Sequence, residues 1–551
     1  MPLHACLLLV TLTALPTRAA AVQAGRTYFV AGNGDDGRSG LGASNAWRTI
    51  TRVNAQTLVP GDSVLFEGGL VFSGTIELRA GESGSPSQPI TFASYGGEAA
   101  VIHARLGTGF DLVDVAGIHI RELLIVGSGG LRNGGIGISL YSQLPGDVKL
   151  HNIRIERCRV TGFRRGGISI GAYNGRTGFA DVRVEHCRID RNGNNGMAVW
   201  GFYDRNWGQE LADYAHRDLY VGHNVFASNW GDPLRTNGHT GSGLEIAQAA
   251  RVLVEFNLAF DNGRLNTYSG GGPVGIWLWD VLQGVVQFNE SHHNQSASLD
   301  GGGFDLDGGS VQCFLQYNYS HDNEGPGFLV AQFPDGARPM RDVRVRYNVS
   351  ERDGGRADSG ALQLWSGDPA GPPLERVLFH SNTVFVEARS LGIAKAFRAF
   401  GAGSVSGSGF ANNIFFTRGP GVWLGENAMS VPPLWVGNLY FAQEGPFVLS
   451  DTGSSYASLS AWRAGRGQEL LLGSPVGVQA DPLLSAPGTG GTLDDPTALA
   501  TLDAYRLQPT SPFADLGLAL PSLGITVGLR DFYGRSLPAG TGYSIGADEG
   551  P

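Results

Sequence analysis

Four related stretches decide the fold of this chain: FNLAFDN (residues 256–262), FNESHHN (288–294), YNYSHDN (317–323) and YNVSERD (347–353). Each has Asn at its second position and Asn or Asp five residues later. Outside these stretches the first column continues at intervals of 29 to 37 residues, so that it comprises Cys158, Cys187, Asn224, Asn257, Asn289, Asn318, Asn348 and Asn382. The second column comprises Asn192, Asn229, Asn262, Asn294, Asn323 and Asp353. Two polar columns in one register predict a structural repeat.

A glycine-led strand follows each second-column residue, as in Gly243–Ile246, Gly275–Leu278 and Gly303–Leu306. Such strands cannot bury an apolar face alone, so we expect successive coils to stack as parallel sheets roughly 4.8 Å apart, with like residues over like. The Asn columns are expected to hold the turns through amide hydrogen bonds. Cys158 and Cys187 share a column and are expected to stack as small apolar residues, with a disulfide as the alternative.

The composition favours short strands joined by many turns. Glycine accounts for 84 of 551 residues and charged residues for 16%, which favours many turns over helical bundles. The net charge of -10 argues against nucleic acid as a partner. Residues 1–24 are expected to be a signal peptide cleaved after Ala24, with a retained anchor as the alternative, and no other stretch is a candidate membrane span. We therefore expect a secreted, extracellular or periplasmic monomer.

The repeat over about residues 110 to 445 resembles that of the pectate-lyase-like superfamily. The chain also begins like members of that superfamily, with Thr27–Val30, Gly34–Gly37, Trp47–Ile50 and Pro60–Val64, and it ends like them, with Tyr505–Leu507, Ser511-Pro512, Asp531–Gly534 and Ile545–Ala547. The resemblance implies a right-handed parallel β-helix solenoid with a short N-terminal capping helix, here within Thr49 to Leu58. The expected divisions are residues 25–110 for the cap and first coils, 111–445 for the repeats and 446–551 for the C-terminal coils and cap.

Side chains alternate along a strand, so inward Leu and Ile residues leave their neighbours on the outer face. That outward set contains Glu245, Trp277, Trp279, Asp305 and Asp307. Asp305 and Asp307 lie about 6.7 Å apart at the backbone, and Glu245 and Asp305 about 9.6 Å apart over two coils. Both separations approach the roughly 6.5 to 9.5 Å used by the carboxylate pair of inverting glycosidases. We therefore predict Asp305, Asp307 and Glu245 as catalytic residues.

The predicted substrate-binding residues are aromatic or cationic: Trp277, Trp279, Trp200 and Arg264. Trp200 and Trp365, on flanking coils, are expected to extend the tryptophan stripe of Trp277 and Trp279. Aromatic faces serve as platforms for sugar rings. The alternative is that loops such as 204–217 and 264–272 cover the tryptophans and make a minor core. A further prediction concerns His321, which is stacked over His292 and followed by Asp322, because a neighbouring carboxylate can orient a histidine as a general base. Structural histidines are the more common outcome in turn columns.

A calcium site is the competing interpretation of the acidic cluster, with Asp300, Asp305, Asp307 and Asp280 as oxygen ligands. The resemblance implies that a lyase would pair such an ion with a Lys or Arg base, yet neither of the two lysines, Lys149 and Lys395, falls in this patch. The sequence therefore favours hydrolysis of a polysaccharide lying in a groove on the outer face. A calcium-dependent polysaccharide lyase and a non-catalytic glycan-binding protein are the alternatives.

Overall fold

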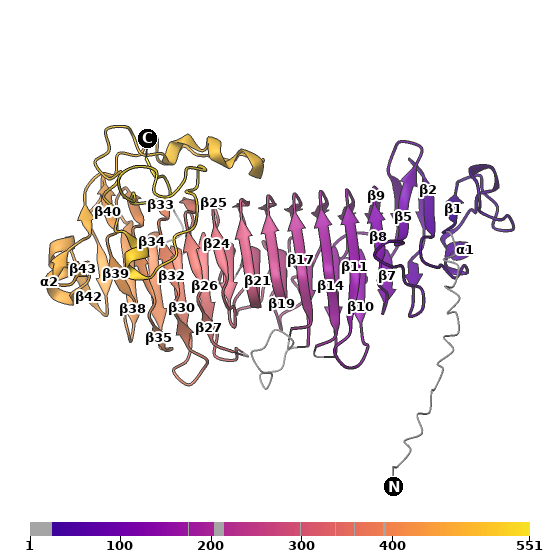
Figure 1. The fold of residues 1–551 in the computed structure, drawn as a ribbon, viewed down its shortest axis with the longest axis horizontal. Helices are drawn as coiled ribbons and strands as arrows, with labels where there is room; N and C mark the ends of the chain where they lie inside the picture. The colour runs from indigo at the N-terminus through magenta and orange to yellow at the C-terminus, as the bar shows by residue number, and fades with distance from the viewer. Residues whose placement is uncertain are drawn as a thin grey trace, which may run out of the picture.

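The structure is a computed structural model that describes residues 25–174, 176–202, 214–297, 299–336, 338–356, 359–388 and 393–550. These residues wind into one long right-handed parallel β-helix, whose axis runs horizontally in Figure 1. The expected signal peptide, residues 1–24, lies outside the described residues. Within the described chain, no helix has both the length and the apolar character that a membrane crossing requires.

Each coil passes through three parallel ladders of strands, which we call face 1, face 2 and face 3. Face 1 is formed by β4 (Ile76–Leu78), β7 (Phe110–Val113), β10 (Ile138–Ser142), β13 (Ile168–Ala172), β16 (Asn195–Trp200), the first halves of β19 (Ser242–Glu255) and β21 (Val274–Gln287), β23 (Gly302–Asp307), β26 (Phe328–Gln332), β30 (Gly360–Ser366), β34 (Lys395–Gly401), β38 (Trp423–Met429) and β41 (Leu449–Asp451).

Face 2 follows face 1 in every coil. It is formed by β1 (Thr27–Val30), β2 (Ser63–Glu67), β5 (Ile90–Tyr95), β8 (Ile118–Arg121), β11 (Lys149–Glu156), β14 (Gly178–Glu185), β17 (His216–Gly222), the second halves of β19 and β21, β24 (Phe314–Gln316), β28 (Arg344–Arg346), β32 (Leu378–His380), β36 (Gly409–Ala411) and β39 (Leu434–Val436). A short ladder precedes it in three coils, formed by β27 (Met340–Arg341), β31 (Leu374–Glu375) and β35 (Val405–Ser406).

Face 3 closes each coil and is a separate 14-stranded sheet. It is formed by β3 (Val71–Ser73), β6 (Ala100–His103), β9 (Leu123–Val126), β12 (Arg159–Thr161), β15 (Arg188–Asp190), β18 (Val225–Ala227), β20 (Leu258–Phe260), β22 (Glu290–His292), β25 (Tyr319–His321), β29 (Val349–Glu351), β33 (Thr383–Glu387), β37 (Ile414–Arg418), β40 (Leu439–Gln443) and β45 (Val478–Gln479).

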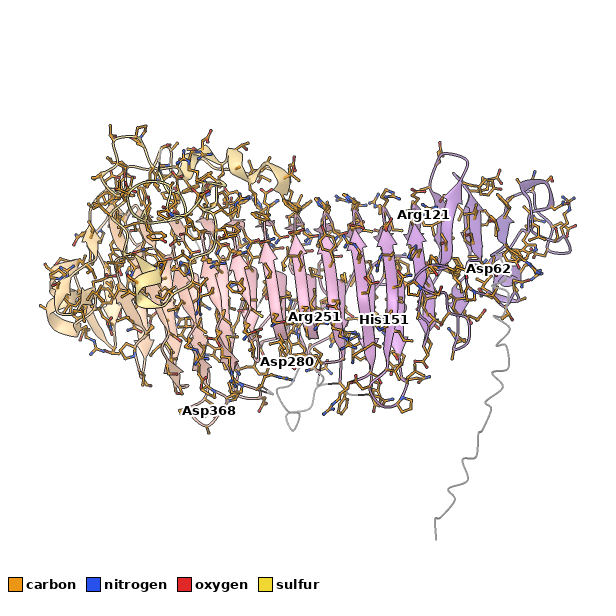
Figure 2. All side chains as sticks on the ribbon, viewed as in Figure 1. Asp62, Arg121, His151, Arg251, Asp280 and Asp368 are labelled. Atoms are coloured by element: carbon orange, nitrogen blue, oxygen red, sulfur yellow. The ribbon has the colours of Figure 1, made fainter. Side chains whose placement is uncertain are left out.

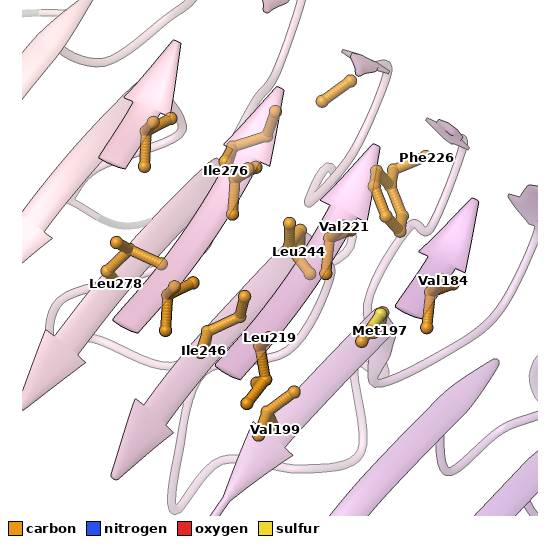
Figure 3. Packing of buried hydrophobic residues seen from close by; sticks show 14 of the residues in the cluster. Val184, Met197, Val199, Leu219, Val221, Phe226, Leu244, Ile246, Ile276 and Leu278 are labelled. Carbon is orange, nitrogen blue, oxygen red and sulfur yellow. The ribbon is translucent and has the colours of Figure 1, made fainter. Parts of the chain in front are cut away.

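The core lies inside the three faces and is filled by like residues stacked coil over coil. Leu244 pairs in register with Ile276, which pairs with Phe304, and all three side chains are fully buried. Figure 3 shows neighbouring members of this column, with Met197, Leu244 and Ile276 on successive strands. The alternation predicted for the glycine-led strands is therefore confirmed, and it turns the intervening residues of face 1 outward.

Both polar columns form continuous hydrogen-bonded ladders between faces. In the first column the Asn289 side-chain amide donates to Oδ1 of Asn318 at 2.9 Å, and Asn318 donates likewise to Asn348 at 3.1 Å. This ladder runs two coils farther than the sequence pattern indicated, through Asn413 and Asn438. Each amide satisfies buried backbone groups at a turn, as expected.

The cysteines of the first column take the place of asparagines in the earlier coils. Cys158 and Cys187 are buried free thiols, and the backbone N–H of Cys158 donates to the Cys187 sulfur at 3.4 Å. They stack as small apolar residues, so the disulfide alternative is not adopted.

A short helix closes each end of the core. At the N-terminal end, α1 (Ile50–Asn54) begins at Thr49, whose hydroxyl accepts the N–H of Arg52, and it lies within the predicted capping segment. At the C-terminal end, α2 (Leu459–Arg466) inserts Trp462, which is fully buried and donates to Asp451 at 2.7 Å. Only the first of these helices was predicted.

The remaining C-terminal residues, 482–550, which we call the C-terminal segment, do not continue the coils. They run back over face 3, above β25, β33 and β40 in Figure 1. A second apolar core joins the two, with Val349 and Ile414 of face 3 packed among Leu502, Tyr505 and Phe532. Short irregular elements complete the chain: β42 (Ser454–Tyr456), β43 (Leu470–Leu471), β44 (Ser474–Pro475) and the 3-10 helices Ala43–Asn45, Pro496–Thr501, Asp503–Tyr505 and Leu520–Leu523.

Candidate active site

The outward side chains of face 1 form two parallel columns over the middle coils. Glu245, Trp277 and Asp305 occupy equivalent positions on β19, β21 and β23, and Trp279 pairs in the same way with Asp307. The register thus confirms that Glu245 and Asp305 are two coils apart. It places two indoles between one carboxylate on β19 and two carboxylates on β23.

A cavity of about 270 Å³ opens beside β23, and we call it the acidic cavity. Three carboxylates that the sequence singled out line one part of it: Asp300, Asp305 and Asp307. The other lining residues come from the preceding loops and from later coils: Gly271, Leu299, Leu329, Ala331, Arg356, Ser359, Gln363, Trp365, Arg398 and Phe400. Acidic groups, cations and aromatic rings therefore line one cavity.

Asp305 and Asp307 differ in their environments. Asp305 is only 3% exposed, and its Oδ1 has no hydrogen-bond partner within the described residues. Burial, and then the charges of Asp307 and Asp300, raise its pKa well above that of an ordinary aspartate. Asp307 accepts the backbone N–H of Gly308 at 2.7 Å, and burial raises its pKa to about 7. Strongly displaced carboxyl pKa values of this kind are typical of acid–base sites.

Asp300 reaches the acidic cavity from the loop before β23. Its Oδ2 accepts the backbone N–H of Gly272, which belongs to the loop before β21. Burial raises the pKa of Asp300, while the Gly272 hydrogen bond and the nearby His239 favour the ionised form. The sequence predicted Asp300 only as a metal ligand, because it does not share the strand alternation of Asp305 and Asp307.

Glu245 is tied to the same face by two hydrogen bonds. Its Oε1 accepts the indole N–H of Trp279 at 3.1 Å, and its Oε2 accepts the Asn195 amide at 2.8 Å. Glu245 does not line the acidic cavity, but its charge contributes to the raised pKa of Asp307. It is therefore an electrostatic neighbour of the cavity, held by Trp279.

Trp277 does not form the open platform that the sequence predicted. Its side chain is 5% exposed, its indole N–H donates to the Ser242 hydroxyl at 3.1 Å, and the His239 ring packs against it edge-on at 5.2 Å. His239 comes from the loop between β18 and β19, which folds over this part of face 1. The alternative, a loop-covered minor core, is therefore correct for Trp277, while Trp279 is only half-buried.

Trp200, at the end of β16, is the most open of the predicted tryptophans, with 37% of its surface exposed. Its ring stacks on Tyr141 at 5.9 Å, and its indole donates to Ser169 at 3.0 Å. It lines a second cavity of about 550 Å³, also on face 1, together with Arg165 and Arg235. Residues 204–213 of the loop that was considered as a cover for the tryptophans lie outside the described residues.

Arg264 is placed away from both cavities. Its guanidinium stacks over the Trp230 ring at 4.0 Å, on the loop that follows β20. Arg264 therefore does not reach substrate in the acidic cavity, because its side chain stacks instead on Trp230 of the loop between β18 and β19.

Asp280 is also separated from the other predicted calcium ligands. It is fully buried and pairs with Nε of Arg338 at 2.6 Å, and the Gln248 amide donates to its other oxygen. Figure 2 places it toward the lower edge of the solenoid, where face 1 turns into face 2. Among the described residues, the three potential metal-ligand atoms that converge to within 4.8 Å belong to Glu290, His292 and His321, and none belongs to the four aspartates. The four aspartates therefore do not fit the compact oxygen shell that calcium prefers.

His321 lies on face 3, beneath the C-terminal segment, and does not join the carboxylates of face 1. Its side chain is fully buried, with Nδ1 2.9 Å from Asp322 and Nε2 3.2 Å from Glu290. The predicted His–Asp pair is thus present. Because His321 lies on face 3 and the acidic cavity on face 1, His321 cannot act as a general base in the acidic cavity.

The far wall of the acidic cavity was not predicted, apart from Trp365 as an extension of the tryptophan stripe. Trp365 and Phe400 are paired in register on β30 and β34, with ring centroids 6.5 Å apart. Arg398 stacks on Phe400 at 3.9 Å and pairs with Glu426 at 3.1 Å, and Arg356 pairs with Glu324 at 2.5 Å. The alternation of Arg398 and Phe400 with the buried Phe397 is the sequence pattern that could have placed these two side chains on the outer face.

The fold defines the class of this protein as a right-handed parallel β-helix, and the acidic cavity lies on its face 1. No protein-family model matches the chain. It is similar to a lacto-N-biosidase of Bifidobacterium longum subsp. longum, at 25% identity over 491 residues, covering 72% of this chain and 29% of the relative. The chain thus spans less than a third of that curated relative.

A solved structure has the same fold. The GH136 lacto-N-biosidase from Eubacterium ramulus superposes with a TM-score of 0.54 at 22% identity, covering 66% of this chain and 64% of that chain. A selenomethionine form of that protein gives the same TM-score and covers 68% of its chain.

Proposed function

We propose that this protein is a glycoside hydrolase that cleaves a glycan bound on face 1, with the reaction in the acidic cavity. The observation that carries the proposal is the grouping of Asp300, Asp305 and Asp307 in one cavity with the aromatic pair Trp365 and Phe400. Carboxylates in different protonation states are what glycosidic cleavage requires.

Asp307 is the proposed general acid. With a pKa of about 7 it keeps its proton through much of the neutral range and can donate it to the leaving oxygen. Asp300 is the proposed ionised partner: burial raises its pKa, but the Gly272 N–H and the nearby His239 oppose that effect by stabilising its carboxylate. It would activate water or attack the sugar carbon directly. Asp305 is the most deeply buried of the three and would stay neutral, so that it adds no negative charge beside Asp300 and Asp307.

The rest of the cavity offers the contacts that a sugar needs. The Trp365 ring provides an apolar surface for one face of the sugar, and Gln363, Arg356 and Arg398 provide hydrogen-bond donors for its oxygens. The volume of about 270 Å³ is at the small end for ligand sites, so one end of a glycan fits better than the middle of a long chain. The similarity to lacto-N-biosidases makes a lacto-N-bioside the first substrate to test.

A calcium-dependent lyase is the weaker alternative. The cationic side chains of the cavity that could act as a base, Arg356 and Arg398, are both engaged by glutamates.

We further propose that the protein acts outside the cytoplasm as a monomer. N-terminal sequencing of exported protein would test the location, and size-exclusion chromatography with light scattering would test the oligomeric state.

The deciding experiment is a turnover assay of the purified chain on a chromogenic lacto-N-bioside, neutral glycans and uronate polymers. New reducing ends without ultraviolet absorbance from unsaturated products are expected. Unsaturated products would establish the lyase, and binding without turnover by either readout would establish a glycan-binding protein.

A further inference from the structure

A second polar cluster lies on face 3, on the other side of the core from the acidic cavity. It consists of Glu290 and His292 on β22 and His321 on β25. His292 and His321 are paired in register, and their rings stack at 4.7 Å with 12° between the planes. One ligand atom from each of the three residues lies within 4.8 Å of the others.

Two atoms of this cluster are buried without any hydrogen-bond partner in the described chain: Oε2 of Glu290 and Nε2 of His292. Glu290 is fully buried and His292 is 5% exposed. A buried carboxylate oxygen and a buried imidazole nitrogen that lack partners are costly, and each such group in a folded protein needs an explanation. Both are electron-pair donors, so a cation between them would satisfy both.

His321 is oriented as a metal-binding histidine would be. Its Nδ1 lies 2.9 Å from Asp322, which is fixed in turn by Arg352 at 2.9 Å, and its Nε2 points to Glu290 at 3.2 Å. Histidine ligands commonly donate their second N–H to a carboxylate, which fixes the ring and exposes the other nitrogen. The Glu290–His321 separation also approximates the edge of a tetrahedral zinc shell, roughly 3.4 Å for bonds of about 2.1 Å.

We propose that Glu290, His292 and His321 form a binding site for a divalent transition metal, with zinc the best match to two imidazoles and a carboxylate. Asp494 of the C-terminal segment supplies the fourth ligand, since its Oδ1 is 3.6 Å from Nε2 of His292. Binding of one ion together with His321 and Glu290 requires the His292 ring to turn out of its stacked position, because two parallel rings 4.7 Å apart do not direct their nitrogens at one point.

The site joins two parts of the chain that are distant in sequence. Leu493, next to Asp494, already donates its backbone N–H to Glu290 at 2.8 Å. A metal held by β22, β25 and Asp494 would therefore clamp the C-terminal segment onto face 3. Its predicted effect is on the stability of that contact and not on the chemistry of the acidic cavity.

The test is zinc binding by the full chain after chelation and buffer exchange, with calorimetric titration of zinc chloride and metal analysis. We expect one zinc per chain and a higher melting temperature in its presence. His292→Ala and Glu290→Gln should each weaken zinc binding at least about 100-fold. Asp494→Asn, at a largely exposed side chain, should weaken it measurably and reduce the melting shift.

The matched control is His223→Ala, because His223 and His186 form a similar stacked pair at 4.8 Å without a convergent carboxylate. That variant should bind zinc as the parent does. Absence of stoichiometric zinc on the parent chain, or binding that survives both His292→Ala and Asp494→Asn, overturns the proposal. The cluster would then be a protonated His321 bridging Glu290 and Asp322.

Discussion

Asp305 and Asp307 occupy alternate positions of β23, so their side chains leave the same side of the strand and line the same cavity. Burial, and then the charge of Asp307, raise the pKa of Asp305. Two carboxyl groups this close do not ionise together, so Asp305 keeps its proton while Asp307 titrates. With Asp300 as the proposed ionised partner, the acidic cavity holds a proton donor and a carboxylate together, which is the requirement for glycosidic cleavage.

The pH dependence of turnover follows from Asp307. Its pKa of about 7 predicts that activity falls as the pH rises through about 7, because the proposed acid loses its proton. Asp307→Asn should lower kcat by about 10²- to 10⁴-fold and remove that alkaline limb. Asp261→Asn, at an exposed turn residue with positive φ, is the control and should leave the profile unchanged. An unaltered alkaline limb in Asp307→Asn would assign the acid to another residue.

The stability of the folded protein should also depend on the ionisation of Asp307. The folded-state pKa of Asp307, about 7, lies above the 3.8 of an ordinary aspartate, so the folded protein binds more protons between those values. Its contribution is fully present below about pH 4 and is lost as the pH rises through about 7. Melting temperatures measured across that range should fall less steeply for Asp307→Asn than for the parent. Parallel curves for the two proteins would contradict the raised pKa.

The repeat could be predicted from sequence because every coil repeats the same polar residues. Asn289, Asn318 and Asn348 stack, and that stacking fixes the register of the strands between them. The cavity wall could not be predicted in the same way, since Asp300 enters from a loop and Arg398 from a coil about 100 residues later. Burial of Trp277 depends on the loop that carries His239, and no strand pattern specifies where a loop folds.

The Asn ladder provides a direct test of the coil register. Asn318 donates to Asn348 at 3.1 Å and to the Val286 carbonyl at 2.9 Å, while its Oδ1 accepts from Asn289. Asn318→Ala removes these bonds and leaves buried groups unpaired, at about 1–3 kcal/mol for each such group. Urea denaturation should therefore show a clear loss of unfolding free energy. The exposed Asp261→Asn is the comparison. Equal stability of the two variants would show that the hydrogen bonds of Asn318 do not stabilise the coils.

Calcium should not be required for turnover. Asp280 is committed to Arg338, and the remaining three aspartates do not converge on one point, so the cavity lacks a calcium shell. Protein treated with chelator and exchanged into calcium-free buffer should turn over glycan at the same rate before and after addition of calcium chloride. Activity that returns only with calcium, together with unsaturated products, would favour the lyase over the hydrolase.

Trp277 and Trp200 should respond differently to the same truncation, because one is buried and the other is open. Trp277 is 5% exposed beneath His239, so Trp277→Ala should cost about 3–5 kcal/mol of folding free energy. Trp200 is 37% exposed and lines the larger cavity, so Trp200→Ala should leave the melting temperature nearly unchanged. If glycan extends into that cavity, the loss of stacking should weaken its binding by about 1–3 kcal/mol. Melting curves and glycan affinity, measured on both variants, test these two expectations. A stable Trp200→Ala with unaltered affinity would confine the glycan to the acidic cavity. A stable Trp277→Ala would show that the loop over Trp277 is not part of the folded core.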